Sequence, residues 1–329
     1  MKKYMAILLV GCLIVTTTAC GSKTEGSTTL LSSDAITSTE TVSTSSESTQ
    51  QNSTENPDPA PMDNATKPLK AHYGKKTGTT KTFTGLEPLA ERELHLVDPE
   101  NTRGLSCEKI SHGFGVAKDG KPHEISVNNQ KRYEEYGALC LDTSGEKCVY
   151  LTFDCGYENG YTEKILDTLR DKKVTAAFFV TMDYVKSAPE LVARMINEGH
   201  IVGNHSTTHA DFSKINRTQM LQEIQNLDNY LRQNFGYSAP FFRFPEGNFS
   251  INALDLVQNA EFKSVFWSSA YDDWDVNNIR GKQYAFDKVT SRLHPGCVLL
   301  LHSVSPDNAD ALGDIIDYAQ SQGYNFKSL

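Results

Sequence analysis

The sequence predicts an α/β fold built on a parallel sheet. Two observations indicate this architecture. Short apolar segments alternate with charged segments of helical periodicity along the C-terminal part of the chain, and strands that are apolar throughout are typical of parallel sheets buried on both faces. Seven such strands predict a (β/α)7 barrel, slightly smaller than the eight-stranded kind. The expected strands are residues 149–153, 175–180, 200–204, 241–244, 263–268, 297–301 and 324–327.

Three helices are expected between these strands. The first begins at Thr162 and carries apolar residues at helical spacing. The second has Pro189 in its first turn and ends near Gly199. The third is the longest, over residues 218–235, and Gly236 is its stop signal, because glycine readily adopts the left-handed conformation that ends helices.

Residues 1–20 are typical of a secretory signal. Lys2 and Lys3 precede an apolar run over residues 6–15, which is too short for an ordinary membrane-spanning helix. The small residues before Cys20 resemble a bacterial lipoprotein cleavage box, which predicts that Cys20 becomes the lipidated first residue. The protein would then lie outside the cytoplasm, anchored to the cell membrane of a bacterium. Plain secretion after cleavage nearby is the alternative.

Residues 21–64 predict a disordered stalk. Ser, Thr, Glu and Gln dominate this segment, so it cannot bury enough apolar surface to offset its chain entropy. Residues 65–105 are expected to be a partly ordered linker with one short helix near residues 88–96, and residues 106–329 to form the folded domain. A stalk of this kind would hold that domain above the membrane, within reach of a cell wall.

Charge and cysteine content limit the partners. The net charge is −9 without a basic run, which argues against nucleic acid. Five cysteines remain after Cys12 leaves with the signal and Cys20 takes the lipid, so at least one thiol stays unpaired outside the cytoplasm. Cys140 and Cys148 flank a turn-like stretch, where a cross-strand disulfide is one option.

Polar side chains follow the ends of several predicted strands. The carboxyl ends of parallel strands meet at one edge, so these side chains are expected to form a site there. The segments concerned are residues 152–155, 205–209, 243–247, 273–274 and 299–302.

His205 and His209 have a spacing that zinc sites often use, if their segment turns helically. Surface or core histidines are the alternative for the pair alone. Cys155 ends another predicted strand and could supply a thiolate as third ligand, which leaves the fourth position for water.

Two carboxylates have plausible cationic partners. Asp154 ends an apolar strand, where an unpaired carboxylate is costly, and Arg243 offers a counter-charge. Ionised, Asp154 could take a proton from a metal-bound water; a strand-end cap is its alternative role. His302 follows another apolar strand. Asp273 would favour its imidazolium and make it an acid, whereas a lone histidine there is more often a satisfied core residue.

In order and spacing, these segments resemble the motifs of the polysaccharide deacetylases, the family 4 carbohydrate esterases with a NodB homology domain. The resemblance covers residues 106–329 and implies a distorted (β/α)7 barrel. Further stretches resemble the PdaA-like branch, the delta-lactam-biosynthetic de-N-acetylases of spore cortex peptidoglycan. Those stretches are residues 153–161, 199–205, 305–309 and 323–329.

The resemblance implies a role for each residue of the site. Asp154 would be the general base, tethered by Arg243, and His302 the general acid, tuned by Asp273. His205 and His209 would hold a divalent metal, with zinc as the expected ion.

The resemblance also implies the surroundings of the substrate and the reaction. Backbone near Glu246 would donate to the oxyanion, and Trp274 and Leu300 would line the pocket for the acetyl methyl. A metal-activated water would attack an acetamide carbonyl through a tetrahedral oxyanion and release acetate and a glucosamine-type amine.

Cys155 departs from the family pattern, in which most members have a second Asp as metal ligand. The PdaA-like branch usually has Asn there, so its members already lack that ligand. Cys155 would either complete a Cys-His-His site that prefers soft metals or be a small unreactive filler beside a two-histidine site. The second reading is favoured, because a bound thiolate would weaken the Lewis acidity of the metal. Glu246 is another departure, since many relatives have an aromatic residue there.

These expectations lead to one function and its alternatives. The first is de-N-acetylation of N-acetylmuramic acid in peptidoglycan glycan strands, toward muramic lactam of spore cortex, by a monomer that meets the membrane only through its lipid. The alternatives are an N-acetylglucosamine deacetylase of the vegetative wall or another glycan, and a non-catalytic glycan-binding protein with a degraded metal site. Hydrolysis of a glycosidic bond by Asp154 and Asp273 would leave the histidines without a role.

Overall fold

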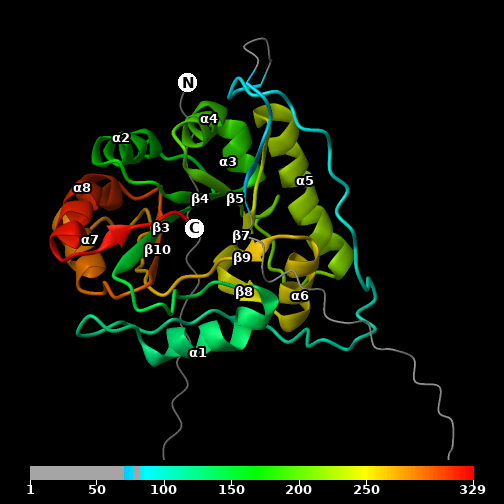
Figure 1. The fold of residues 1–329 in the computed structure, drawn as a ribbon, viewed down its shortest axis with the longest axis horizontal. Helices are drawn as coiled ribbons and strands as arrows, with labels where there is room; N and C mark the ends of the chain where they lie inside the picture. The colour runs from blue at the N-terminus through cyan, green and yellow to red at the C-terminus, as the bar shows by residue number, and fades with distance from the viewer. Residues whose placement is uncertain (1–69, 77–81) are drawn as a thin grey trace, which may run out of the picture. The chain divides into compact units, whose positions relative to one another are not determined.

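The computed structural model describes residues 70–76 and 82–329 (Figure 1). The predicted signal, the lipidation predicted at Cys20 and the stalk predicted over residues 21–64 lie outside this range. None of the helices in the described part of the chain is long and apolar enough to span a membrane.

A parallel sheet of seven strands is the centre of the fold, as predicted. The strand order is β10-β3-β4-β5-β7-β9, and β11 pairs with the start of β3 at Cys148 and Val149. Each strand overlaps one of the expected segments, although several are shorter. Their bounds are β3 Cys148–Cys155, β4 Ala177–Val180, β5 Ile201–Asn204, β7 Phe241–Phe242, β9 Lys263–Ser264, β10 Cys297–His302 and β11 Asn325–Phe326.

The sheet curls because the chain that follows β9 returns to β10, at the other end of the strand order. Ser268 donates its backbone N–H to the Val298 carbonyl at 2.9 Å, and Leu300 donates to the Ser269 carbonyl at 2.9 Å. The two ends of the sheet thus meet through a short contact rather than a full ladder. The result is a distorted, incompletely closed barrel, which confirms the predicted fold class.

Helices surround the sheet in Figure 1. The three expected helices are α2, α4 and α5 of the structure. The longest, α5, begins with a capping box in which Asn216 and Gln219 satisfy each other's backbone N–H groups, and ends at Gly236 with φ 60°. The helices are α1 Glu124–Tyr133, α2 Thr162–Lys172, α3 Met182–Ser187, α4 Pro189–Asn197, α5 Arg217–Phe235, α6 Ile251–Asn259, α7 Lys282–Thr290 and α8 Pro306–Ser321, with 3-10 turns η1 Glu134–Tyr136 and η2 Pro245–Gly247.

Two small antiparallel pairs join the N-terminal part of the chain to the rest. They are β1 His72–Tyr73 with β6 Tyr237–Ser238, and β2 Ile110–Ser111 with β8 Asn248–Phe249.

The segment of residues 82–105 runs along α5 as an extended strap. It has no helix near residues 88–96, so that prediction is wrong. The backbone N–H of Arg92 donates to Asn229 Oδ1 at 2.8 Å, and that of Leu94 donates to Gln225 Oε1 at 2.7 Å. Because these side chains of α5 accept from alternate residues, the strap satisfies its backbone without helical hydrogen bonds.

A buried arginine fastens the strap to two helices. Arg217 is 2% exposed, and its guanidinium donates to the Val97 carbonyl at 3.0 and 3.2 Å. The same group pairs with Asp255 of α6 at 2.9 Å, and Arg103 of the strap binds that carboxylate from the other side at 2.6 Å. The strap therefore supplies acceptors that Arg217 needs in the interior.

All five cysteines of the described residues are free, and four of them are buried. Cys140 and Cys148 are both unpaired, so the structure lacks the disulfide that was considered between them. The Cys148 thiol instead lies 3.4 Å from the Asp142 carboxylate.

We expect a protein that begins at residue 106 to unfold at lower urea concentration than one that begins at residue 70. Removal of the strap leaves Arg217 donors buried without acceptors, and each such group costs about 1–3 kcal/mol. Equilibrium urea unfolding of the two proteins measures the difference. Equal midpoints would show that the strap adds nothing to stability.

Candidate active site

The predicted site residues come together at the carboxyl edge of the sheet. Asp154 lies in β3 and His302 ends β10, and the register of these adjacent parallel strands pairs the two residues directly. His205 and Arg243 are the first residues after β5 and β7. Asp273 lies on the loop after β9.

These residues border an open cleft of about 980 Å³. Seven of the residues singled out in the sequence line it. They are Asp154, His205, His209, Glu246, Trp274, Leu300 and His302. Arg243 and Asp273 lie behind this lining, 0% and 6% exposed, and each acts on the cleft through the residue that it contacts.

Asp154 and Arg243 form a buried ion pair. The guanidinium Nη1 donates to Asp154 Oδ1 at 2.8 Å. Burial raises the pKa of Asp154, but the charges of Arg243, His205 and His302 more than offset this, so its pKa lies below the ordinary value. Asp154 is therefore held as a carboxylate at neutral pH, with Oδ2 facing His205 Nε2 at 3.6 Å.

The side chain of Arg243 is held in one orientation by its neighbours. Its other nitrogens donate to the backbone carbonyls of Val265 at 3.0 Å and Phe266 at 3.2 Å, and its guanidinium stacks 4.1 Å above the Phe179 ring. Gly203 makes room for that ring, because a Cβ there would lie 2.5 Å from it. Two of its three nitrogens and the ring against its face thus fix the plane of the guanidinium, so Nη1 is held toward Asp154.

His302 and Asp273 form the second pair. His302 Nδ1 lies 2.8 Å from Asp273 Oδ1, and the His302 backbone N–H donates to Oδ2 at 2.6 Å. Burial lowers the pKa of His302, but Asp273 and, to a smaller extent, Asp154 raise it by more. The pKa of His302 therefore lies above its ordinary value. The imidazole is held in the orientation and charge state of a proton donor, with Nε2 left for the cleft.

His205 and His209 lie close together, but not on a helical turn. Their ring centroids are 4.9 Å apart, and the intervening chain is a loop in which Ser206 and His209 have φ of 68° and 58°. The left-handed residues bring the rings together as a helix would have done. His205 Nδ1 lies 2.9 Å from the Arg243 carbonyl, so Nδ1 carries the proton and Nε2 presents its lone pair to the cleft.

Cys155 lies on the other side of β3 from Asp154, because successive side chains of a strand alternate. It is 0% exposed and is not part of the cleft lining. Burial raises the pKa of its thiol far above the ordinary value, so the side chain is a neutral thiol in the core. This placement favours Cys155 as a small unreactive core residue over Cys155 as a metal ligand.

A polysaccharide deacetylase family model matches residues 142–265. The chain is 42% identical to the peptidoglycan-N-acetylmuramic acid deacetylase PdaA of Bacillus subtilis, over 68% of this chain and 85% of that protein. The solved structure of B. subtilis PdaA, a family 4 carbohydrate esterase, superposes with a TM-score of 0.66 at 41% identity, over 68% of this chain and 96% of that one. A peptidoglycan-N-acetylglucosamine deacetylase of Bacillus cereus is 32% identical, over 55% of this chain and 66% of that protein.

The chain belongs to the polysaccharide deacetylase family. Members are hydrolases that act on carbohydrate N-acetyl groups. The ordered motifs at the strand ends and the curled parallel sheet both agree with this membership.

Polysaccharide deacetylases typically depend on a metal, and the residues present fit one in part. His205 is neutral at physiological pH, since burial lowers its pKa to about 4, and neutral imidazole is the form that binds metals. Within residues 70–76 and 82–329, no group of three or more His, Cys, Asp or Glu side chains could hold a metal ion. The donor set therefore fits an ion held by His205 and His209, with its remaining positions open.

Several residues that line the cleft of this deacetylase were not singled out in the sequence. Phe114, Tyr157, Trp267 and Arg292 also line the cleft. Tyr157 lies in the stretch of residues 153–161 that resembles the PdaA-like branch, although it was given no role there. The other three come from segments without a motif, so only the folded chain shows that they meet. Glu246, which was singled out, has φ 56° and accepts a hydrogen bond from Asn248 Nδ2 at 2.8 Å.

Arg243→Met should lower deacetylation by about 10²-fold or more and move the acid limb of the kcat/KM profile to higher pH. The reason is that Asp154 loses the charge that lowers its pKa and keeps the burial that raises it. Acetate release measured from pH 4 to pH 9 tests this, with Arg170→Met on the exposed face of α2 as control. An acid limb that does not move would show that Arg243 does not set the ionisation of Asp154.

Metal titration by calorimetry should separate the two readings of Cys155. We expect Cys155→Ser to bind zinc as the wild type does, because the thiol does not face the cleft. His205→Ala should lose binding by about 10-fold or more, since it removes one of two imidazoles. A Cys155→Ser protein that binds as poorly as His205→Ala would instead establish a Cys-His-His site.

Proposed function

We propose that this deacetylase removes the N-acetyl group of N-acetylmuramic acid in peptidoglycan, a step toward muramic delta-lactam in spore cortex. One observation carries the chemical part of the proposal. Asp154 and His302 stand in register on adjacent strands, and each forms a pair with a second residue, Arg243 and Asp273 respectively. One pair keeps a carboxylate ionised, and the other keeps an imidazole protonated. A base and an acid thus face one cleft at the same pH, which amide hydrolysis needs.

Asp154 and His302 each transfer one proton in the proposed hydrolysis. Asp154 takes a proton from the water that attacks the acetamide carbonyl carbon, which forms a tetrahedral oxyanion. Backbone near Glu246 donates to that oxyanion. His302 gives its proton to the amide nitrogen, the carbon–nitrogen bond breaks, and acetate and a free amine leave.

A divalent metal, zinc in our proposal, would when bound lower the pKa of water and offset the charge on the oxyanion. His205 and His209 are its ligands. Trp274, 62% exposed, and Leu300, 4% exposed, form the wall for the acetyl methyl.

The choice of muramic acid has two supports. The first is the relative named for that activity, which aligns over a larger share of both chains than the relative named for N-acetylglucosamine. The second is Arg292, which lines the cleft and has no ion pair in the described part of the chain. Its Nη1 donates to the Ala270 carbonyl. An unpaired guanidinium suits the lactyl carboxylate that distinguishes muramic acid from glucosamine.

The location follows from the same proposal. A signal over residues 1–20, a lipid on Cys20 and a stalk over residues 21–64 would place the domain outside the cytoplasm, between membrane and wall. That is where a peptidoglycan substrate lies. We propose residues 106–329 as the catalytic domain of a monomer.

The test is acetate release by the purified chain from peptidoglycan glycan strands and from chitin oligomers, each with and without zinc. We expect release from the glycan strands, and a loss of about 10²–10⁴-fold in Asp154→Asn, which removes the base. Release from glycan strands by Arg292→Gln should fall about 10-fold or more, and any weaker release from chitin oligomers should stay the same. Arg170→Gln is the matched control.

Release from chitin oligomers at an equal rate would assign the enzyme to N-acetylglucosamine. No release from either substrate with any metal would identify the chain as a glycan-binding protein.

A further inference from the structure

Asn308 lies directly behind the acid pair, in the first turn of α8. It is 0% exposed. Its Nδ2 donates one hydrogen to Asp273 Oδ2 and the other to the His302 carbonyl at 3.1 Å. Both hydrogens of the amide are therefore used on the two residues of the acid pair.

The orientation of this amide is fixed by its partners. Asp273 Oδ2 and the His302 carbonyl can only accept, so the NH₂ group of Asn308 faces them. Oδ1 is thereby turned toward Tyr271, which donates its hydroxyl to it at 2.6 Å. Burial raises the pKa of Tyr271 far above its ordinary value, so the hydroxyl keeps the proton that this bond needs.

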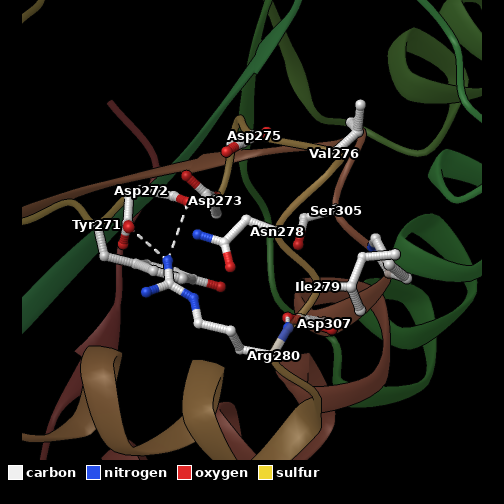
Figure 2. Close-up of a pocket in the computed structure, with 11 residues that line it drawn as sticks. Tyr271, Asp272, Asp273, Asp275, Val276, Asn278, Ile279, Arg280, Ser305 and Asp307 are labelled. Carbon is white, nitrogen blue, oxygen red and sulfur yellow. Dashed lines mark hydrogen bonds and ion pairs between the residues drawn. The ribbon is translucent and has the colours of Figure 1, made fainter.

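The helix start fixes where Asn308 stands. Ser305 caps α8 by accepting from the Asn308 backbone N–H at 3.3 Å, and Pro306 occupies the first turn. Figure 2 shows the loop with Tyr271 and Asp273 beside this helix start. Arg280 ties loop and helix together, because its backbone N–H donates to Asp307 Oδ2 at 2.8 Å while its guanidinium pairs with Asp272.

Asp273 depends on these donors. Its side chain is 0% exposed and has no lysine or arginine partner in the described residues. Oδ1 accepts from His302 Nδ1, and Oδ2 accepts from the His302 backbone and Asn308. Asn308 is thus the one side chain besides His302, among residues 70–76 and 82–329, that holds this carboxylate in place.

We propose that Asn308 is a positioning residue of the deacetylase, which acts on the acid His302 through Asp273, and that Tyr271 orients its amide. The inference rests on the proposed function, since it assigns His302 the role of acid. Without the amide, Asp273 is free to turn away from Nδ1. Burial and the charge of Arg243, which lower the pKa of His302, would stay. Of the two carboxylates that raise this pKa, Asp154 would keep its full effect and Asp273 would lose part of its effect.

The first test is Asn308→Leu, which keeps the volume and removes both donors. We expect kcat to fall about 10–100-fold with KM within about twofold, because a charge-assisted hydrogen bond is lost on a residue that does not touch the substrate. The basic limb of the kcat/KM profile should move to lower pH. Tyr271→Phe should change kcat and the limb in the same direction, but less.

Tyr318→Phe is the control for the hydroxyl, because Tyr318 lies on the exposed face of the same helix. A fall in kcat with an unmoved basic limb would overturn the proposal and leave Asn308 with a purely structural role. A limb that moves to higher pH would overturn it too, since Asp273 would then hold His302 better without the amide.

A double-mutant cycle tests the route through Asp273. If Asn308 acts through that carboxylate, Asn308→Leu should cost little further in an Asp273→Asn background, whereas additive losses would contradict the proposal. An NMR titration of the His302 imidazole in wild type and Asn308→Leu needs no turnover. It can therefore confirm a fall in the His302 pKa even if the protein proves not to be a deacetylase, and an unchanged pKa would refute the positioning role.

Discussion

The buried pair of Arg243 and Asp154 is the interaction on which the rest of the site depends. A guanidinium with no exposure needs partners for its nitrogens, and each of the three donates one hydrogen bond, to two backbone carbonyls and one carboxylate oxygen. The Phe179 ring packs against its face. The arrangement leaves the other oxygen of Asp154 for the cleft. Breaking such a pair costs about 3–5 kcal/mol when one charge stays buried alone, so the base and the local fold are kept by the same contact.

The two functional pairs are built on different principles. Arg243 is always charged, so it fixes the ionisation of Asp154 across the whole physiological range. In the proposed mechanism, Asp273 acts on His302, a group that must change its charge during the reaction. Asp273 accepts hydrogen bonds from both His302 and the amide of Asn308. A permanent counter-ion therefore serves the base, and an adjustable hydrogen-bond network serves the acid.

Much of this could be predicted from the sequence. Apolar runs predicted all seven strands of the sheet, because most of the strands are buried on both faces and their sequences are continuous. The helix near residues 88–96 was wrong, since the strap takes its hydrogen bonds from side chains of α5 that are remote in sequence. Neither Asn308 nor Arg292 was assigned to the site, although Asn308 lies in the stretch of residues 305–309 that resembles the PdaA-like branch. The positioning role that we propose for Asn308 depends on its contacts with Asp273 and Tyr271, which only the folded chain brings to it.

The order of the strands also has a consequence for how the protein becomes active. Asp154, the proposed base, lies on the first strand of the sheet along the chain, and His302, the proposed acid, lies on the strand beside it, although the two residues are far apart in the sequence. The last strand, β11, pairs with the start of that same first strand. Bringing such distant segments together costs loop-closure entropy before their contacts offset it. In the proposed export of the chain with its N-terminus first, the centre would therefore be incomplete until β10 had emerged, and hydrolysis would begin only outside the membrane.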